Sequence, residues 1–155
     1  SRTPLRGFSG IGKGAPLHCT GVGKVLLSAL TEKELSDLLK DYPLKHFTPN
    51  TLTQAAALKK ELERIRTQGY ALDNEEHEPG IRCVAAPIRN HTGTVIASIS
   101  VAGRTTSITP ARVPELIEAV IDTAEKISQR FGHGSLPASP RSHPSGRAAV
   151  DRQRR

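Results

Sequence analysis

The chain has 155 residues, of which 36% are hydrophobic and 3% aromatic, with neither Trp nor Met. This length leaves room for one domain, and the composition predicts a core of Leu, Ile, Val and Ala, which favours layered helices and sheet over an aromatic-rich β-sandwich. The formal net charge is +7, but five Arg and one Asp lie within 133–155, so the rest of the chain is only mildly basic and the charge alone does not indicate a nucleic-acid-binding surface there.

Cysteine usage and hydropathy indicate in which cellular compartment the protein is expected. The two cysteines, Cys19 and Cys83, lie far apart in the chain, which disfavours a disulfide framework. No apolar run approaches the roughly 18 residues that a membrane-spanning helix needs. We therefore expect a cytoplasmic protein with no membrane partner.

Three helices are predicted in the first half of the chain. Thr20 is placed to cap the first one, because apolar residues recur at helical spacing after it. The next two starts carry capping boxes, in which a Thr and an acidic or amide residue three positions later cap each other: Thr31 with Glu34, and Thr51 with Gln54. Gly69 is the residue expected to end the third helix, after about four turns.

The second half predicts strands and one long helix. A short strand at 70–73 precedes an acidic loop, which we expect to be solvated, and two β-branched segments flank a turn at Asn90–Gly93. Thr109 and Pro110 are expected at the N-cap and first position of a helix that Gly132 ends. The strands of the hairpin are expected at 81–89 and 94–102, and a disordered basic tail at 133–155.

The predicted hairpin has two unlike faces. If Arg89 pairs with Thr94, alternation places one apolar set on a face suited to a helix, namely Val84, Ala86, Ile88, Val95, Ala97 and Ile99. The other face carries small, partly polar side chains, with Ile81, Cys83 and Ala85 opposite Ala102, Ser100 and Ser98. Small side chains leave space above a sheet, so either a helix packs unusually close or a small molecule fills a pocket there.

Residues 20–24, Thr-Gly-Val-Gly-Lys, form a second candidate feature at the first helix start. Glycines let a ligand approach the backbone, and the free N–H groups and dipole of a helix start favour an anion such as a carboxylate. The alternative is that the glycines serve tight helix packing. The run matches neither the phosphate-binding P-loop nor the dinucleotide-binding pattern.

Three runs of sequence resemble the regulators of the IclR family: APLHCTGVGKVLLSAL at 15–30, LKKELERIRTQGYALDNEEHEPGIRCVAAPI at 58–88 and IASISVAG at 96–103. The resemblance covers about residues 5–132. It implies an α/β (α+β) fold, with a GAF-like or profilin-like curved antiparallel sheet flanked by helices. It also implies binding of a small effector, often an organic acid, and assembly into dimers or tetramers.

The resemblance further implies which parts of such a regulator the chain contains. Operator DNA would be bound only through an N-terminal winged helix-turn-helix, which is absent from this sequence. Residues 1–132 would be the effector-binding domain, incomplete at its N-terminus, because a helix and two strands usually precede the Pro-Leu-His run. No cofactor is implied.

The same resemblance assigns the effector pocket to particular residues. These are Gly21, Val22, Asp73, Ile81, Cys83 and Ser100, with Ala85, Ser98 and Ala102 as a candidate wall. The amides of Gly21 and Val22 would hold a carboxylate. Two positions depart from the family: Ala102 stands where a second serine is often found, and Gly7 where a bulky apolar residue is common. Both departures weaken any transfer of effector identity.

Two alternatives to a ligand sensor follow from the same residues. Cys83 could be the nucleophile of a small enzyme, with His18, His77 and Asp73 as partners, but a free Cys in a strand is more often a buried apolar residue, so we expect no catalytic residue. The domain could instead be a ligand-free interaction module. A metal site is not favoured, because the residues available have no recognisable ligand spacing: Asp73, Glu75, Glu76, His77 and Cys83.

Overall fold

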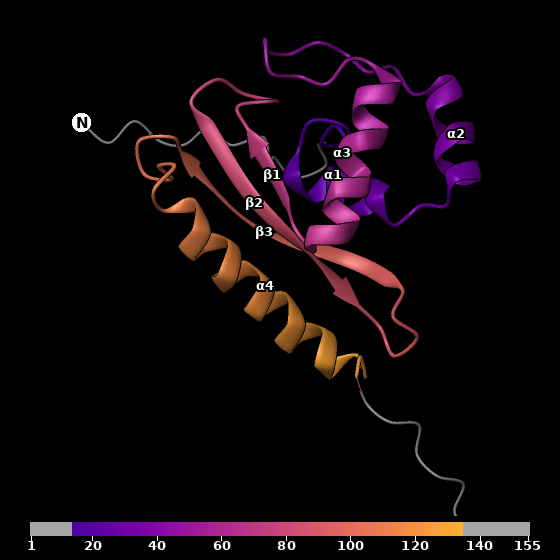
Figure 1. Ribbon diagram of the computed structural model, residues 1–155, viewed down its shortest axis with the longest axis vertical. Coiled ribbons are helices and arrows are strands. Elements are labelled where there is room, and N and C mark those ends of the chain that lie inside the picture. The colour runs from indigo at the N-terminus through magenta and orange to yellow at the C-terminus, as the bar shows by residue number, and fades with distance from the viewer. Residues whose placement is uncertain (1–13, 135–155) are drawn as a thin grey trace, which may run out of the picture.

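The structure is a computed structural model that describes residues 14–134, so Gly7 and nearly all of the expected tail at 133–155 lie outside the described residues. The described strands form one antiparallel sheet in the order β1-β2-β3. The long helix α4 lies along one face of this sheet, and α1 lies on the other with α3 beside it (Figure 1). The elements are α1 Gly21–Ser28, α2 Glu32–Asp41, α3 Ala55–Gln68, β1 Ala71–Asn74, β2 Ile81–Arg89, β3 Val95–Arg104 and α4 Val113–Arg130.

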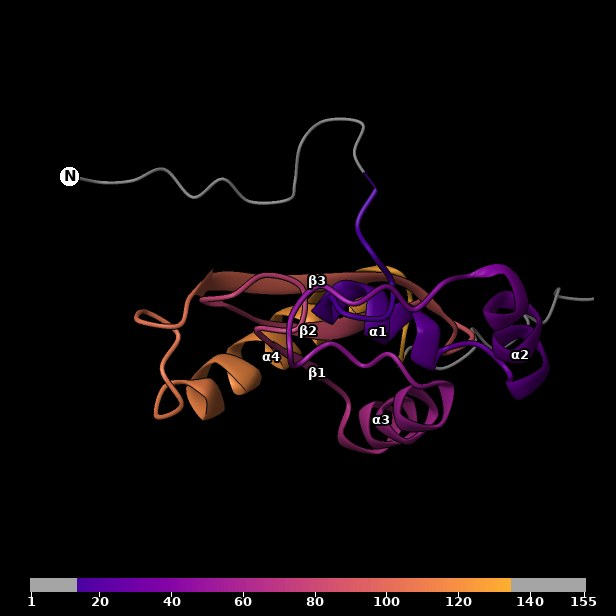
Figure 2. The same cartoon turned by 90° about the horizontal axis from the view of Figure 1, so that it is seen from above.

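Each face of the sheet has its own hydrophobic cluster, which confirms that the hairpin has two unlike faces. Below α4, the buried side chains Val84, Ala86 and Ile88 of β2 pack against Val120 and Ala124. On the opposite face, leucines, a valine and an isoleucine from α1, α2 and α3 pack around the small side chains of β1 and β2. Figure 2 shows α2 at the far end of the molecule from the first turn of α4. The mixed helix and sheet architecture expected from the sequence is confirmed.

Most of the local start and stop signals are confirmed. The Thr20 hydroxyl accepts a hydrogen bond from the Gly23 amide at 3.2 Å, and Thr31 with Glu34 forms a complete capping box. Gly69 ends α3 with φ of 81°, a left-handed conformation that favours glycine.

Two helix starts were predicted wrongly. Gln54 and not Thr51 occupies the N-cap position of α3, without a capping hydrogen bond from its side chain. The Thr51 hydroxyl is engaged elsewhere: it accepts from the amides of Phe47 and Thr48 and donates to the Glu76 carbonyl at 2.6 Å. At α4, Thr109 lies in a preceding turn, and the helix begins at Val113 with Pro114 in its first turn. In both cases the N-cap lies three residues later than the sequence predicted.

The strand pairing of the hairpin was also predicted wrongly, by two residues. Arg89 pairs with Val95 and not with Thr94, and a β-bulge next to Ile88 shifts the register, so that Ala85 lies opposite Ser100. Because side chains alternate with a period of two, a shift of two residues changes the partners but leaves each side chain on its predicted face.

Candidate functional site

The floor of the candidate site is a patch of short side chains on the sheet face that α1 covers. Pairing across the three strands places two rows side by side, and all six residues share this face. The rows are Ala71, Ala85 and Ser100, and Asp73, Cys83 and Ala102. Four of the sequence-predicted pocket residues or wall residues of β2 and β3 thus lie together with Asp73.

The first residue of α1 packs directly on this floor. A Cβ atom added at Gly21 would lie 2.9 Å from the Cys83 Sγ, which is too close for a real side chain, and 3.1 Å from the Ala85 Cβ, which is unusually tight. At Gly23, a Cβ would lie 2.6 Å from both the Leu17 Cα and the Thr20 Oγ1. The glycines therefore do serve tight helix packing, and at Gly21 this packing occurs at the candidate site itself.

Cys83 joins α1 to β3. Burial raises the pKa of the Cys83 thiol to about 11, while hydrogen bonds with the Ser100 side chain and the Gly21 backbone act in the opposite direction. The Cys83 Sγ lies beside Gly21, and Ser100 lies on the same face of the neighbouring strand, so the structure brings these three residues together. The Val22 N–H donates to no acceptor in residues 14–134, which leaves it available to an anion.

The β3 side of the site is open. Ser100 and Ala102 are exposed, whereas Ala85 is fully buried under the helices. The Ser98 hydroxyl is half-buried and donates to the Ala86 carbonyl at 3.1 Å. Ile81 is half-buried at the beginning of β2, opposite Arg104, and so lies at the end of the floor.

Asp73 supplies the acidic wall of the site. It is only 5% exposed, and its Oδ1 accepts a hydrogen bond from the Glu76 amide at 2.8 Å. Burial raises the pKa of the Asp73 carboxyl to about 6; the Glu76 amide lowers it, the Glu76 charge raises it, and the Lys24 charge lowers it. At neutral pH this carboxyl is therefore largely ionised, about one pH unit above its titration midpoint.

Lys24 is the functional candidate that the sequence reasoning missed. Its side chain is fully buried, and its Nζ donates to the Leu72 carbonyl at 2.8 Å and to Glu76 Oε1 at 2.6 Å, with Glu61 Oε1 at 3.4 Å. The signal was present in the sequence: Lys24 follows Gly21 by three residues, so both lie on the same face of α1.

The acidic loop after β1 is not solvated as expected. Glu76 and His77 are buried, because Thr48 and Thr51 reach across from the segment before α3 and donate to the backbone carbonyls of Glu75 and Glu76 at 2.6 Å each. Glu75 has a φ of 59°, a left-handed conformation that is uncommon for a residue other than glycine. Its carboxylate accepts from the Gly80 amide at 2.7 Å, which holds the turn in this conformation.

The groups proposed for a cysteine enzyme are not arranged for catalysis. Burial raises the pKa of Cys19 to about 12, and the Cys83 thiol is likewise protonated at neutral pH. The His18 ring is buried, with Nε2 2.9 Å from the Lys45 carbonyl and Nδ1 3.2 Å from the Tyr42 hydroxyl. Within residues 14–134, no group of three or more His, Cys, Asp or Glu side chains is arranged to hold a metal ion.

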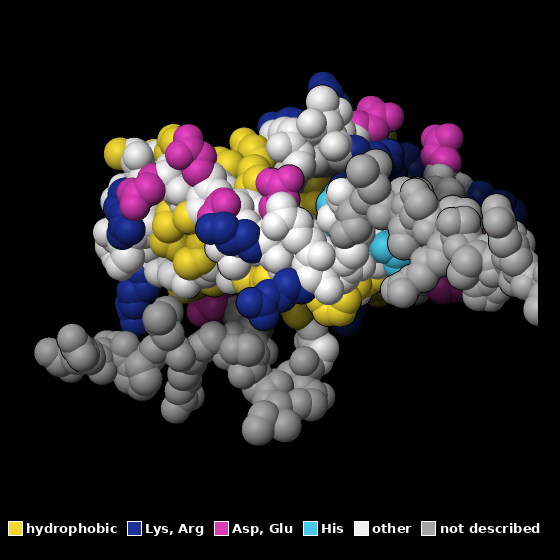
Figure 3. Space-filling view, turned by 90° about the horizontal axis from the view of Figure 1, so that it is seen from below, with side chains coloured by type: hydrophobic (Ala, Val, Ile, Leu, Met, Phe, Trp, Pro, Cys, Tyr) yellow, Lys and Arg dark blue, Asp and Glu magenta, His cyan; other side chains and the backbone are white. Residues whose placement is uncertain are grey.

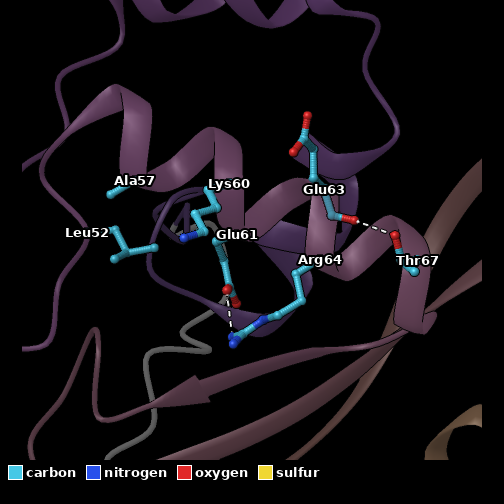
Figure 4. A pocket seen from close by; sticks show the side chains of 7 residues that line it. All are labelled: Leu52, Ala57, Lys60, Glu61, Glu63, Arg64 and Thr67. Carbon is cyan, nitrogen blue, oxygen red and sulfur yellow. Dashed lines mark hydrogen bonds and ion pairs between the residues drawn. The ribbon is translucent and has the colours of Figure 1, made fainter.

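A separate hollow of about 380 Å³ lies on α3 (Figure 4). None of the sequence-predicted site residues lines it, so it is not the candidate site. Glu61 lies at its edge, paired with Arg64 at 2.6 Å, and also reaches the buried Lys24. Its lining residues are Leu52, Ala57, Lys60, Glu61, Glu63, Arg64 and Thr67.

The described body carries no excess charge. Residues 14–134 contain 14 Lys or Arg and 14 Asp or Glu, so the net positive charge of the sequence comes from the two terminal segments. Figure 3 shows basic and acidic side chains interspersed on the face seen there. This distribution does not favour nonspecific binding to nucleic-acid phosphates. No helix of the described range is long and apolar enough to cross a membrane.

A family model described as Bacterial transcriptional regulator IclR C-terminal matches residues 1–129. The HTH-type transcriptional regulator BhcR of Paracoccus denitrificans is 44% identical over 124 residues, which are 80% of this chain and 44% of BhcR. The HTH-type transcriptional repressor AllR of Salmonella typhi is 41% identical over 131 residues, which are 84% of this chain and 48% of AllR. The chain thus spans a little under half the length of these curated relatives.

Solved structures show the same similarity. IclR of Thermotoga maritima superposes with a TM-score of 0.78 at 40% identity, covering 85% of this chain and 53% of that one. A double mutant of the PobR inducer-binding domain from Acinetobacter, in complex with 3-hydroxybenzoic acid, gives a TM-score of 0.71 at 31% identity, with 76% and 67% covered. BhcR and AllR are regulators by name and not enzymes, which does not support the cysteine-enzyme alternative.

Proposed function

Because the chain belongs to the IclR C-terminal family of bacterial transcriptional regulators, we propose that it is the sensing domain of such a regulator and that its ligand is a small organic acid. The observation that carries the proposal is the packing of Gly21, at the start of α1, on Cys83, on the sheet face that also carries Ser100. The acid bound by the similar PobR inducer-binding domain supports the ligand class.

The geometry supports one orientation for such an acid. Its carboxylate would accept from the Val22 amide at the start of α1, where the helix dipole favours an anion. Its other end would reach the exposed Ser100 hydroxyl and the Asp73 carboxyl. An ionised Asp73 repels a carboxylate and accepts from a hydroxyl, so an acid that also carries a hydroxyl group fits best.

The domain would act through self-association. Ligand binding would favour one arrangement of subunits in a dimer or tetramer, which requires that the two arrangements differ in ligand affinity. The outer edge of β3 has no strand beside it within residues 14–134, and such an edge can pair with another chain. Operator DNA would be contacted in the cytoplasm by a DNA-binding domain elsewhere in the regulator.

Thermal denaturation in the presence of short keto, hydroxy and aromatic acids, 3-hydroxybenzoate among them, tests the proposal. An acid at a hundredfold its Kd should add about 2.7 kcal/mol of stability. Ser100→Val should abolish this stabilisation, while Thr94→Val, the same loss of an exposed hydroxyl at the hairpin turn, should preserve it. Equal stabilisation of both variants would refute the site assignment, and no stabilisation by any acid would refute the ligand class.

A further inference from the structure

The least expected group in the structure is the ammonium of Lys24. Lysine is almost never fully buried unless it is paired, because removing its charge from water is costly. Here the side chain has no exposed surface, and its pairing is complete: two carboxylates and one backbone carbonyl surround Nζ. Glu76 lies closest, at 2.6 Å.

The partners of Lys24 lie on both sides of Asp73 in the sequence. The Leu72 carbonyl precedes Asp73 directly, and Glu76 follows it by three residues. The Glu76 amide in turn donates to Asp73 Oδ1 at 2.8 Å. The buried ammonium of Lys24 on α1 therefore binds the residue before Asp73 and also Glu76 after it, and so holds the turn that forms the acidic wall of the candidate site.

The second carboxylate oxygen of Glu76 is also buried. The Glu76 side chain is 10% exposed, and its Oε2 is buried without a hydrogen-bond partner among the described residues. The charged and titratable groups that act on Asp73 come from two elements packed around it, Lys24 from α1 and Glu76 from its own turn. Asp73 in turn acts on the thiols of Cys83 on β2 and Cys19 before α1.

We infer that Lys24 is a positioning residue of the ligand site, which holds the turn that carries Asp73 and, together with Glu76, decides whether Asp73 meets the ligand as an acid or as a carboxylate. The inference rests on the proposed function. A protonated Asp73 can donate to a keto oxygen or a second carboxylate, whereas an ionised Asp73 accepts only from a donor such as a hydroxyl. Lys24 and Glu76 would thus set which acids the site accepts.

Lys24 and Glu76 have opposite effects on the pKa of Asp73, which gives a direct test. The positive charge of Lys24 favours the Asp73 carboxylate, and the negative charge of Glu76 opposes it. In the full 155-residue chain, ¹³C NMR of the aspartate carboxyl carbons would follow the titration of Asp73, assigned by its loss in Asp73→Asn. Lys24→Gln should raise the Asp73 midpoint and Glu76→Gln should lower it, each on the order of one pH unit.

The matched control is Lys60→Gln, which removes the same charge from an exposed position on α3 that forms no ion pair within residues 14–134. It should leave the midpoint of Asp73 unchanged. Amide hydrogen exchange at Glu76 supplies the second readout: it should become faster in Lys24→Gln and not in Lys60→Gln, because the turn loses its internal anchor.

If Lys24→Gln alone does not fold, the double variant Lys24→Gln/Glu76→Gln can be tested instead, because it leaves no unpaired Glu76 charge. The double variant should titrate at a higher pH than Glu76→Gln alone. The inference is overturned if these two titrate alike, or if Lys24→Gln and Glu76→Gln shift the midpoint in the same direction. The titration needs no ligand, so it stands apart from the thermal-denaturation result, and either one can fail alone.

Discussion

The contact between Gly21 and Cys83 predicts a strong coupling between substitutions at these two positions. Gly21→Ala places a methyl group where the Cys83 Sγ would lie at 2.9 Å and the Ala85 Cβ at 3.1 Å. Overpacking of this kind costs about 1–3 kcal/mol. Replacing Gly by Ala in a helix returns up to about 1 kcal/mol. The net expected loss for Gly21→Ala is therefore between roughly 0 and 3 kcal/mol.

Cys83→Ala should relieve the closer of the two contacts. On its own it removes a buried sulfur and costs about 1 kcal/mol. In the double variant, the new methyl group at position 21 occupies part of the space that the sulfur leaves. The double variant should therefore be more stable than the sum of the single losses by about 1 kcal/mol or more. Rescue should be incomplete, because the contact with Ala85 remains.

Urea denaturation of the four proteins measures this coupling, provided that the slope of the free energy with denaturant stays constant among them. Gly14→Ala is the control, because nothing lies within 4 Å of a Cβ at that position, and it should show no coupling to Cys83→Ala. Additive losses for Gly21→Ala and Cys83→Ala would mean that the start of α1 does not pack on the floor of the site, and the proposed ligand position would fail with it.

Three further predictions concern the same region. Gly23→Ala should cost about 3 kcal/mol or more in urea denaturation and resist rescue by Cys83→Ala, because its methyl group would meet the Leu17 backbone. The native pKa of Asp73 is about 6 against an ordinary 3.8, so the folded state holds this proton more tightly than the unfolded state, and the resulting stabilisation is complete below about pH 3.8 and lost as pH rises to about 6. The stability advantage of Asp73→Asn over the original chain should therefore grow by at most about 3 kcal/mol between pH 4 and 7. A difference in stability that stays constant over this range would contradict the burial of Asp73. Cys19 and Cys83, with pKa values of about 12 and about 11, should react with iodoacetamide at pH 7 only on unfolding, and rapid labelling of the native chain would contradict their burial.

Signals that act over a few residues were sufficient to predict most of the elements. The Thr20 cap, the Thr31–Glu34 box and the Gly69 terminus each depend on neighbours within one helical turn, so the sequence contains all that they need. Thr51 has the same local pattern as Thr31, yet its hydroxyl donates to the Glu76 carbonyl, 25 residues away in the chain. A tertiary partner that competes for the capping group is not visible in local sequence.

The residues proposed for the site on β2 and β3 lie on one face of the sheet, as the alternation predicted, but not in the predicted pairs. Cys83 and Ser100 were expected directly opposite each other, but the bulge next to Ile88 places Ala102 opposite Cys83. Ser100 still lies diagonally across from Cys83, because a shift of two residues keeps both on one face. Lys24 was missed because charged residues are assigned to the surface by default, and only its three-residue spacing from Gly21 pointed inward.

Stability alone does not account for the buried charges beside the site. A buried ion pair is often no more stable than apolar side chains of the same volume, so Lys24 and Glu76 need another reason to be charged. Nor do they serve a long-range field, because the described body has equal numbers of basic and acidic residues. Lys24 lies on the helix whose first residue packs on the floor of the site, and its charge favours the ionised form of Asp73 at close range. In the proposed function, attraction for an acid would therefore come from the Val22 amide at the start of α1, and Lys24, whose charge is already paired, would act through the turn that carries Asp73.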